Sequence, residues 1–256
     1  LILGGSGVAG SERTVGADWP SYTEQLLRRY NPDLEVVVAN GGIWSGTSAF
    51  ERMQAFHLRH YQFNLIVIYS GWNDLYSFSM KQQGYLADIA RTNRRLGRPG
   101  RSWYWAREHS VAIAAVAHLY SRGRTLTMGR AVDRFDQRIA LTDANRKLFN
   151  DTVGRQLQQT LHTARRQRIP VLFILQSSAS YTRLFRTLDG PEENLLDTFL
   201  ASHKGYWSQV MAYFYPALAR HLEQVAQQSG ARFIDFNQFA YPFHQLYFDD
   251  LHYRDL

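Results

Sequence analysis

Five short apolar runs, separated by amphipathic stretches, constrain the fold of this chain most strongly. Runs rich in branched residues and bounded by turn residues are typical of buried parallel strands. We expect strands at residues 1–3, 34–39, 64–70, 170–175 and 232–236. Helices are expected between them, at residues 20–30, 48–60, 145–167 and 206–229. The alternation predicts an α/β fold, a three-layer α/β/α sandwich around a mostly five-stranded parallel sheet.

The length of 256 residues suits one domain over residues 1–256. Two segments are too long for a simple crossover, an insertion at about 75–142 and an excursion at 177–204. Both follow strand ends, so we expect them to shape a substrate pocket. Residues 1–5 resemble the stub of a buried strand, and residues 251–256 stop where a helix is expected. Both ends are therefore expected to be truncated, with any targeting or anchoring segment outside this chain.

Charge and cysteine content restrict the classes of partner. No run of 18 apolar residues is present, so no membrane span is expected in this chain. There is no cysteine, which excludes a disulfide framework and a thiolate metal site. The net charge of +7 is concentrated in arginine-rich residues 91–101 and 120–130, which could attract an acidic polymer or could simply be solvated loops. No nucleic-acid reading motif accompanies them, so nucleic acid is not an expected partner.

The glycine run at residues 5–10, Gly-Ser-Gly-Val-Ala-Gly, permits two interpretations. Its spacing matches a dinucleotide-binding turn, but such a turn leads directly into a helix and is followed by an acid after the second strand. Here the next helix is expected only near residue 20, and the second strand ends Val38-Ala39-Asn40. The alternative is that the run presents Ser6 as a nucleophile.

A serine nucleophile needs a base and a group that stabilises the oxyanion. Three polar stretches follow strand ends and can supply these parts. They are NGGIWSGTS at 40–48, SGWND at 70–74 and YFDDLHYRDL at 247–256. Because the carboxyl ends of parallel strands meet at one edge of a sheet, we expect all three to lie near Ser6.

Together these stretches resemble the SGNH, or GDSL-like, hydrolase family. The matching blocks, in order, are Gly4-Gly5-Ser6, Asn40-Gly41-Gly42, Gly71-Trp72-Asn73-Asp74 and Asp249-Asp250-Leu251-His252. The resemblance covers nearly the whole chain and implies the flavodoxin-like fold of that family. It also implies chemistry without a metal or an organic cofactor.

The resemblance implies a role for each matching residue. Ser6 is the expected nucleophile, and His252 is the expected base, which later returns the proton to the leaving group. Asp249 is expected to orient His252, although Asp250 competes for this role. The expected oxyanion donors are the backbone amides of Ser6 and Gly42 and the side-chain amide of Asn73.

These residues predict a serine esterase that forms an acyl-enzyme. Similar proteins act on lipid esters, thioesters, aryl esters and O-acetyl groups of carbohydrates, and an acylated glycan or lipid is the expected substrate class. The Gly-Gly-Ser variant resembles bacterial members associated with the cell envelope or secreted material. Two alternatives stay open: an acyltransferase with the same triad, and a catalytically silent module that binds a glycan or an anionic polymer.

Overall fold

The fold is built on a five-stranded parallel sheet. The computed structural model describes residues 1–9, 19–43, 46–96, 138–178 and 206–239. The strands are β1 Ile2–Gly4, β2 Asn40–Gly42, β3 Ile66–Ser70, β4 Val171–Leu175 and β5 Arg232–Asp235. Their order in the sheet is β2-β1-β3-β4-β5, and every neighbouring pair is parallel. The predicted α/β class and parallel sheet are confirmed.

Side chains alternate along the strands between two apolar clusters, one on each face of the sheet. Leu3 and Ile68 belong to the larger cluster, which the long helices cover. Their neighbours Ile2 and Tyr69 point to the opposite face and form a smaller cluster, against which Trp19 packs. This period of two is the ordinary geometry of a strand buried on both faces. Both faces of the sheet are therefore covered by other elements.

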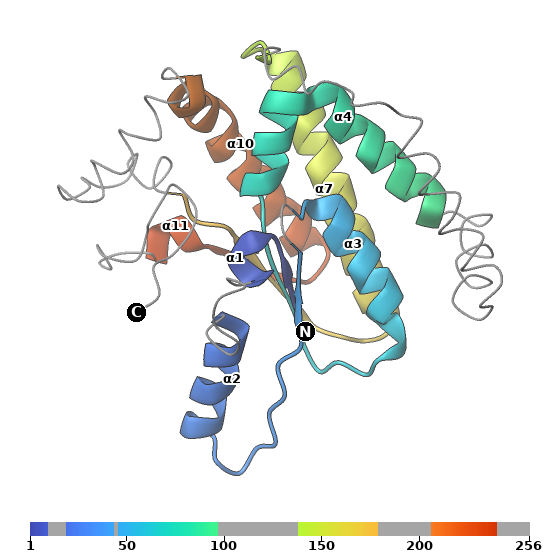
Figure 1. The fold of residues 1–256 in the computed structure, drawn as a ribbon, viewed down its shortest axis with the longest axis vertical. Coiled ribbons are helices and arrows are strands. Elements are labelled where there is room, and N and C mark those ends of the chain that lie inside the picture. The colour runs from blue at the N-terminus through green and yellow to red at the C-terminus, as the bar shows by residue number, and fades with distance from the viewer. Residues whose placement is uncertain (10–18, 44–45, 97–137, 179–205, 240–256) are drawn as a thin grey trace, which may run out of the picture.

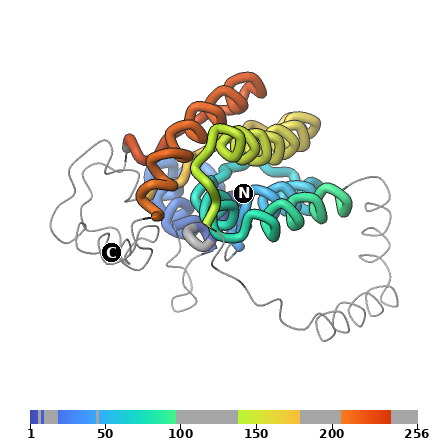
Figure 2. Tube along the Cα trace, turned by 90° about the horizontal axis from the view of Figure 1, so that it is seen from above, coloured from blue at the N-terminus to red at the C-terminus, as the bar shows by residue number. Residues whose placement is uncertain are grey.

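Long helices pack beside one another on one face. They are α3 Ser48–His57, α7 Asp143–Arg166 and α10 Tyr206–Gln228, with α7 in the middle (Figures 1 and 2). A fourth long helix, α4 Trp72–Leu96, kinks at Lys81. It contacts α3 and, less extensively, α7 and α10. The shorter helices are α1 Ser6–Ala9, α2 Trp19–Tyr30, the 3-10 helix Leu58–His60 and α11 Phe236–Phe239. None of the helices in the described ranges has both the length and the apolar character of a membrane span.

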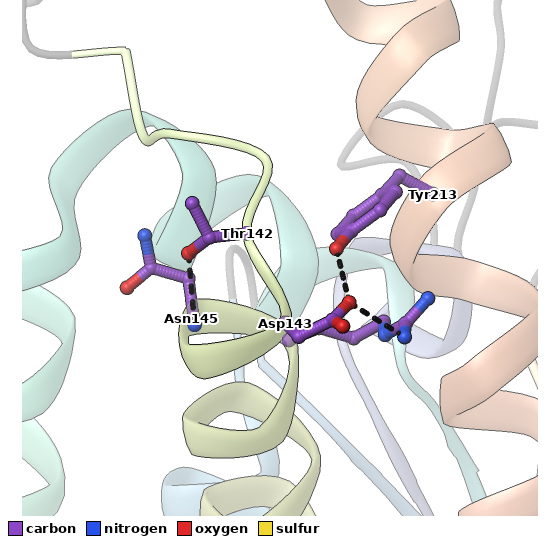
Figure 3. Close-up of polar contacts among 5 residues, drawn as sticks. Thr142, Asp143, Asn145 and Tyr213 are labelled. Atoms are coloured by element: carbon purple, nitrogen blue, oxygen red, sulfur yellow. Dashed lines mark hydrogen bonds and ion pairs between the residues drawn. The ribbon is translucent and has the colours of Figure 1, made fainter.

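Figure 3 shows the start of α7, where a side chain caps the helix and another contacts α10. The side chain of Thr142 caps the helix by accepting a 3.3 Å hydrogen bond from Asn145 N. Asp143 pairs with Arg146 at 2.8 Å and accepts a 2.6 Å hydrogen bond from the Tyr213 hydroxyl of α10. The cap explains why α7 begins two residues before the predicted position.

The second strand differs from the prediction. β2 covers Asn40–Gly42, and residues 34–38 are not part of the sheet. Their backbone bonds to side chains of α2 instead, because Arg28 Nε donates to Val36 O at 2.9 Å and Val38 N donates to Glu24 Oε2 at 2.7 Å. The predicted strand at 34–39 was therefore wrong in position. The predicted insertion at 75–142 begins within α4, and its residues 97–137 lie outside the described residues.

Candidate active site

The glycine run forms a sharp turn at the end of β1. β1 ends at Gly4, and the backbone of Ser6 opens α1 directly afterwards. Gly5 O accepts hydrogen bonds from Val8 N and Ala9 N, both at 3.0 Å, which closes this single turn of helix. The expectation that no helix begins before residue 20 was wrong. The second mismatch with a dinucleotide-binding turn stands, because β2 Asn40–Gly42 carries no acid that could bind a ribose.

Asn73 lies against the turn that carries Ser6. It is the second residue of α4, only 8% exposed, and its Nδ2 donates to Gly46 O at 2.8 Å. A Cβ atom on Gly5 would overlap Asn73 Nδ2, so the amide touches the backbone immediately before Ser6. A primary amide has two N–H groups, and Gly46 takes one of them. The second N–H is the group that an oxyanion would use.

In the block Gly71-Trp72-Asn73-Asp74, the backbone conformation requires the glycine. Gly71 has φ +123°, a conformation that residues with side chains rarely adopt, and a Cβ atom there would lie 2.7 Å from Leu175 Cδ1. Trp72 then anchors the start of α4, stacking on Tyr76 at a centroid distance of 5.2 Å and contacting Trp207 at 5.1 Å. This packing holds the chain on both sides of Asn73.

Gly42 ends β2 and is packed against α1. A Cβ atom on Gly42 would overlap the backbone of Val8 and Ala9, so only glycine permits this approach. The Asn40 side chain joins the same elements, since its Nδ2 donates to Val8 O at 3.0 Å. Its Oδ1 accepts a 2.9 Å hydrogen bond from Gly42 N. An oxyanion that binds Gly42 N–H would therefore share this donor with Asn40.

The structure thus gathers part of the predicted site at the carboxyl edge of the sheet. The backbones of Ser6 and Gly42 and the side chain of Asn73 come from the ends of β1, β2 and β3, which are adjacent strands. The predicted acid and base, Asp249 and His252, lie outside the described residues, as does Asp250. The triad therefore remains a prediction.

A buried carboxylate lies directly beside Asn73. Asp74 is fully buried, and its Oδ2 accepts a 2.9 Å hydrogen bond from Ser48 N. Its Oδ1 accepts hydrogen bonds from Ser48 Oγ at 2.6 Å and from the Tyr85 hydroxyl at 2.7 Å. Burial raises the pKa of Asp74, and the hydrogen bonds from Ser48, Tyr85 and Ser70 oppose this rise.

Glu51 of α3 is a second buried acid next to Asp74. It is 5% exposed, and its Oε1 has no hydrogen-bond partner among the described residues. Burial and the negative charge of Asp74 raise the pKa of Glu51 well above its usual range, against a hydrogen bond from Ser70. Glu51 was not among the residues predicted from the sequence. The available signal was that positions 48, 51 and 55 share one buried stripe of α3, where an acid is unusual.

Comparison with known proteins bears on the fold. No family model matches the sequence, and no curated protein matches it. A variant of Axe2, described as an acetyl-xylooligosaccharide esterase from Geobacillus Stearmophilus, resembles the structure with a TM-score of 0.54 at 13% identity, covering 99% of this chain and 85% of that one. The acetyl xylan esterase AlAXEase gives a TM-score of 0.50 at 12% identity, covering 99% and 91%. This likeness and the strand order β2-β1-β3-β4-β5 show that the chain has the predicted flavodoxin-like α/β fold.

Proposed function

We propose that the protein is a carboxylic ester hydrolase in which Ser6 is the nucleophile. The observation that carries this proposal is the position of the Asn73 amide, which touches Gly5 directly before Ser6. Gly42, on the adjacent strand, packs against the short helix that Ser6 opens. A nucleophile beside converging N–H donors is the arrangement that acyl transfer requires.

In the proposed mechanism, Ser6 Oγ attacks the carbonyl carbon of the ester while His252 takes the hydroxyl proton. Asp249 orients His252, and the oxyanion is stabilised by the backbone N–H groups of Ser6 and Gly42 and by the Asn73 amide. Collapse of this intermediate breaks the ester bond, and the departing alcohol takes the proton from His252. Water then attacks the acyl group on Ser6 by the same steps, which releases the acid and regenerates the enzyme.

We further propose that the substrate is an O-acetyl ester of a carbohydrate. Solved structures with this fold include proteins described as acetyl-xylooligosaccharide or acetylxylan esterases, at 12% to 13% identity to this chain. Acetyl esters need only a small acyl pocket, so the preference for acyl length is a direct check of this proposal.

The test combines hydrolysis with covalent labelling. The wild-type protein is expected to hydrolyse p-nitrophenyl acetate faster than the butyrate and octanoate esters, and to release acetate from acetylated xylan. A fluorophosphonate probe, which reacts with activated serines, is expected to modify the peptide that contains Ser6, as mapped by mass spectrometry. Absence of both hydrolysis and labelling would favour the silent binding module.

Gly5→Ala tests the contact between Asn73 and the nucleophile turn. The added methyl group overlaps Asn73 Nδ2, so we expect it to displace the amide and lower kcat by about 10- to 100-fold. Gly84→Ala is the matched control, because among the described residues its Cβ atom would meet only Lys81 Cβ, at 3.9 Å, within α4. The control is expected to keep full activity and to gain about 0.5–1 kcal/mol of stability. Equal kcat values for the two variants would contradict the proposed role of this contact.

A further inference from the structure

Two neighbouring residues at the start of α4 hold the loop that precedes α3. Asn73 donates to Gly46 O, and Asp74 accepts from the backbone N–H and the hydroxyl of Ser48, two residues further on. The loop is tied to the other strand ends as well, because Gly46 N donates to Ile43 O at 2.8 Å. Asn73 and Asp74 therefore join α3 and α4 through consecutive contacts with residues 46–48.

Of the two buried acids, Asp74 has the better environment for a negative charge. Ser48 and Tyr85 donate hydrogen bonds to its two oxygens, whereas Glu51 Oε1 has no partner among the described residues. Ionising two adjacent buried carboxyls at once costs much free energy, because like charges repel and neither is solvated by water. The hydrogen bonds therefore place the charge on Asp74 and the proton on Glu51.

A charged acceptor strengthens hydrogen bonds, and a dry environment strengthens them further. The contacts from Asp74 to Ser48 are thus among the strongest links between α4 and the loop at 46–48. The link from Asn73 to Gly46, by contrast, is a single bond between neutral groups. Without Asp74, this neutral bond would be the remaining described link between residues 73–74 and residues 46–48, and the packing of Trp72 would still hold the backbone next to Asn73.

We propose that Asp74 is a positioning residue for Asn73: its buried carboxylate fixes the start of α4 to Ser48 and thereby holds the Asn73 amide against Gly5. This inference rests on the proposed function, in which Asn73 binds the oxyanion. Asp74 itself does not touch the reacting atoms. Its effect is on the transition state, through the placement of one donor, so it acts on kcat rather than on KM.

The experiment follows the Asn73 side-chain amide by NMR, where the signal is identified by its loss in Asn73→Ala. The first variant is Asp74→Ala, which removes the acceptor. Asp74→Asn is the conservative variant, because its oxygen can still accept from Ser48 N while the hydroxyls of Ser48 and Tyr85 reorient. Tyr85→Phe removes one donor from Asp74, and Tyr206→Phe is its control, since it loses a buried 3.0 Å bond to Ile139 O elsewhere.

Asp74→Ala is expected to speed hydrogen exchange of the Asn73 amide by about tenfold or more and to lower kcat by about 10- to 100-fold. KM should stay within about twofold of wild type. Asp74→Asn should bring both the exchange rate and kcat part of the way back to their wild-type values. Tyr85→Phe should shift the exchange rate in the same direction, whereas Tyr206→Phe should leave it at the wild-type value.

The proposal is overturned if Tyr85→Phe leaves the exchange rate of the Asn73 amide equal to that of Tyr206→Phe. The comparison of the two tyrosine variants tests whether Asp74 positions the Asn73 amide, even if Asp74→Ala does not fold. If the wild-type protein hydrolyses no ester, the proposed function fails separately, and amide exchange still shows whether Asp74 positions Asn73.

Discussion

Ser6→Ala is expected to reduce hydrolysis of p-nitrophenyl acetate to the background rate. Loss of the nucleophile from a serine hydrolase costs about a millionfold in kcat, because no acyl-enzyme forms and only binding and the oxyanion donors remain. The burst of nitrophenol that reports acylation should disappear as well. Steady-state and rapid-mixing measurements on the purified variant check both expectations.

The Ser6→Ala variant is expected to fold. The residue opens the short helix α1, and alanine is the residue best suited to a helix. Ser229→Ala is the control and should keep wild-type activity, because Ser229 lies between α10 and the amino end of β5, at the opposite edge of the sheet from Ser6. A folded Ser6→Ala protein that retains most of the wild-type rate would contradict the proposed nucleophile.

Asn73→Ala is expected to lower kcat by about 100- to 1000-fold with little change in KM. The loss of one oxyanion donor has this effect because the hydrogen bond strengthens only as charge develops on the substrate oxygen. Gly42 is poorly placed to compensate, since its N–H already donates to Asn40 Oδ1. Asn93→Ala is the control on the same helix, at an exposed position where the side chain contacts Arg52.

Stability measurements separate this catalytic effect from unfolding. Asn73→Ala removes the hydrogen bond to Gly46 O, which costs about 1 kcal/mol of folding free energy. A loss of this size lowers the melting temperature by only a few degrees. Asn73 is not the principal oxyanion donor if kcat falls less than about tenfold, or if kcat/KM falls mainly because KM rises.

The sequence predicted the central strands better than the edge strand β2. The strand predicted at 64–70 is found at Ile66–Ser70, and the one at 170–175 is found at Val171–Leu175. These runs are buried on both faces, so composition alone indicates a strand. Residues 34–38 have a similar composition, but their backbone finds partners on α2, at Glu24 and Arg28. Whether residues 34–38 join the sheet depends on tertiary contacts, which the spacing of apolar residues does not indicate.

The same distinction applies to the candidate site. Gly71 was identified only by its resemblance to a family block, although its positive φ is a local property of the turn after β3. The contacts of Asp74 with Ser48 and Tyr85 join two helices that are far apart in sequence, and no local pattern indicates them. The acid and the base, Asp249 and His252, were assigned by resemblance alone.

The position of β2 at the sheet edge has a consequence for protein engineering. Ser6 and Asn73 follow β1 and β3, which have strands on both sides, whereas Gly42 follows a strand that, within the described ranges, pairs only with β1. The preceding residues 34–38 form no ladder and contact α2. If Gly42 binds the oxyanion as proposed, we expect a library that varies this segment to shift the Gly42 backbone and with it the preference among esters, while the positions of Ser6 and Asn73 stay fixed.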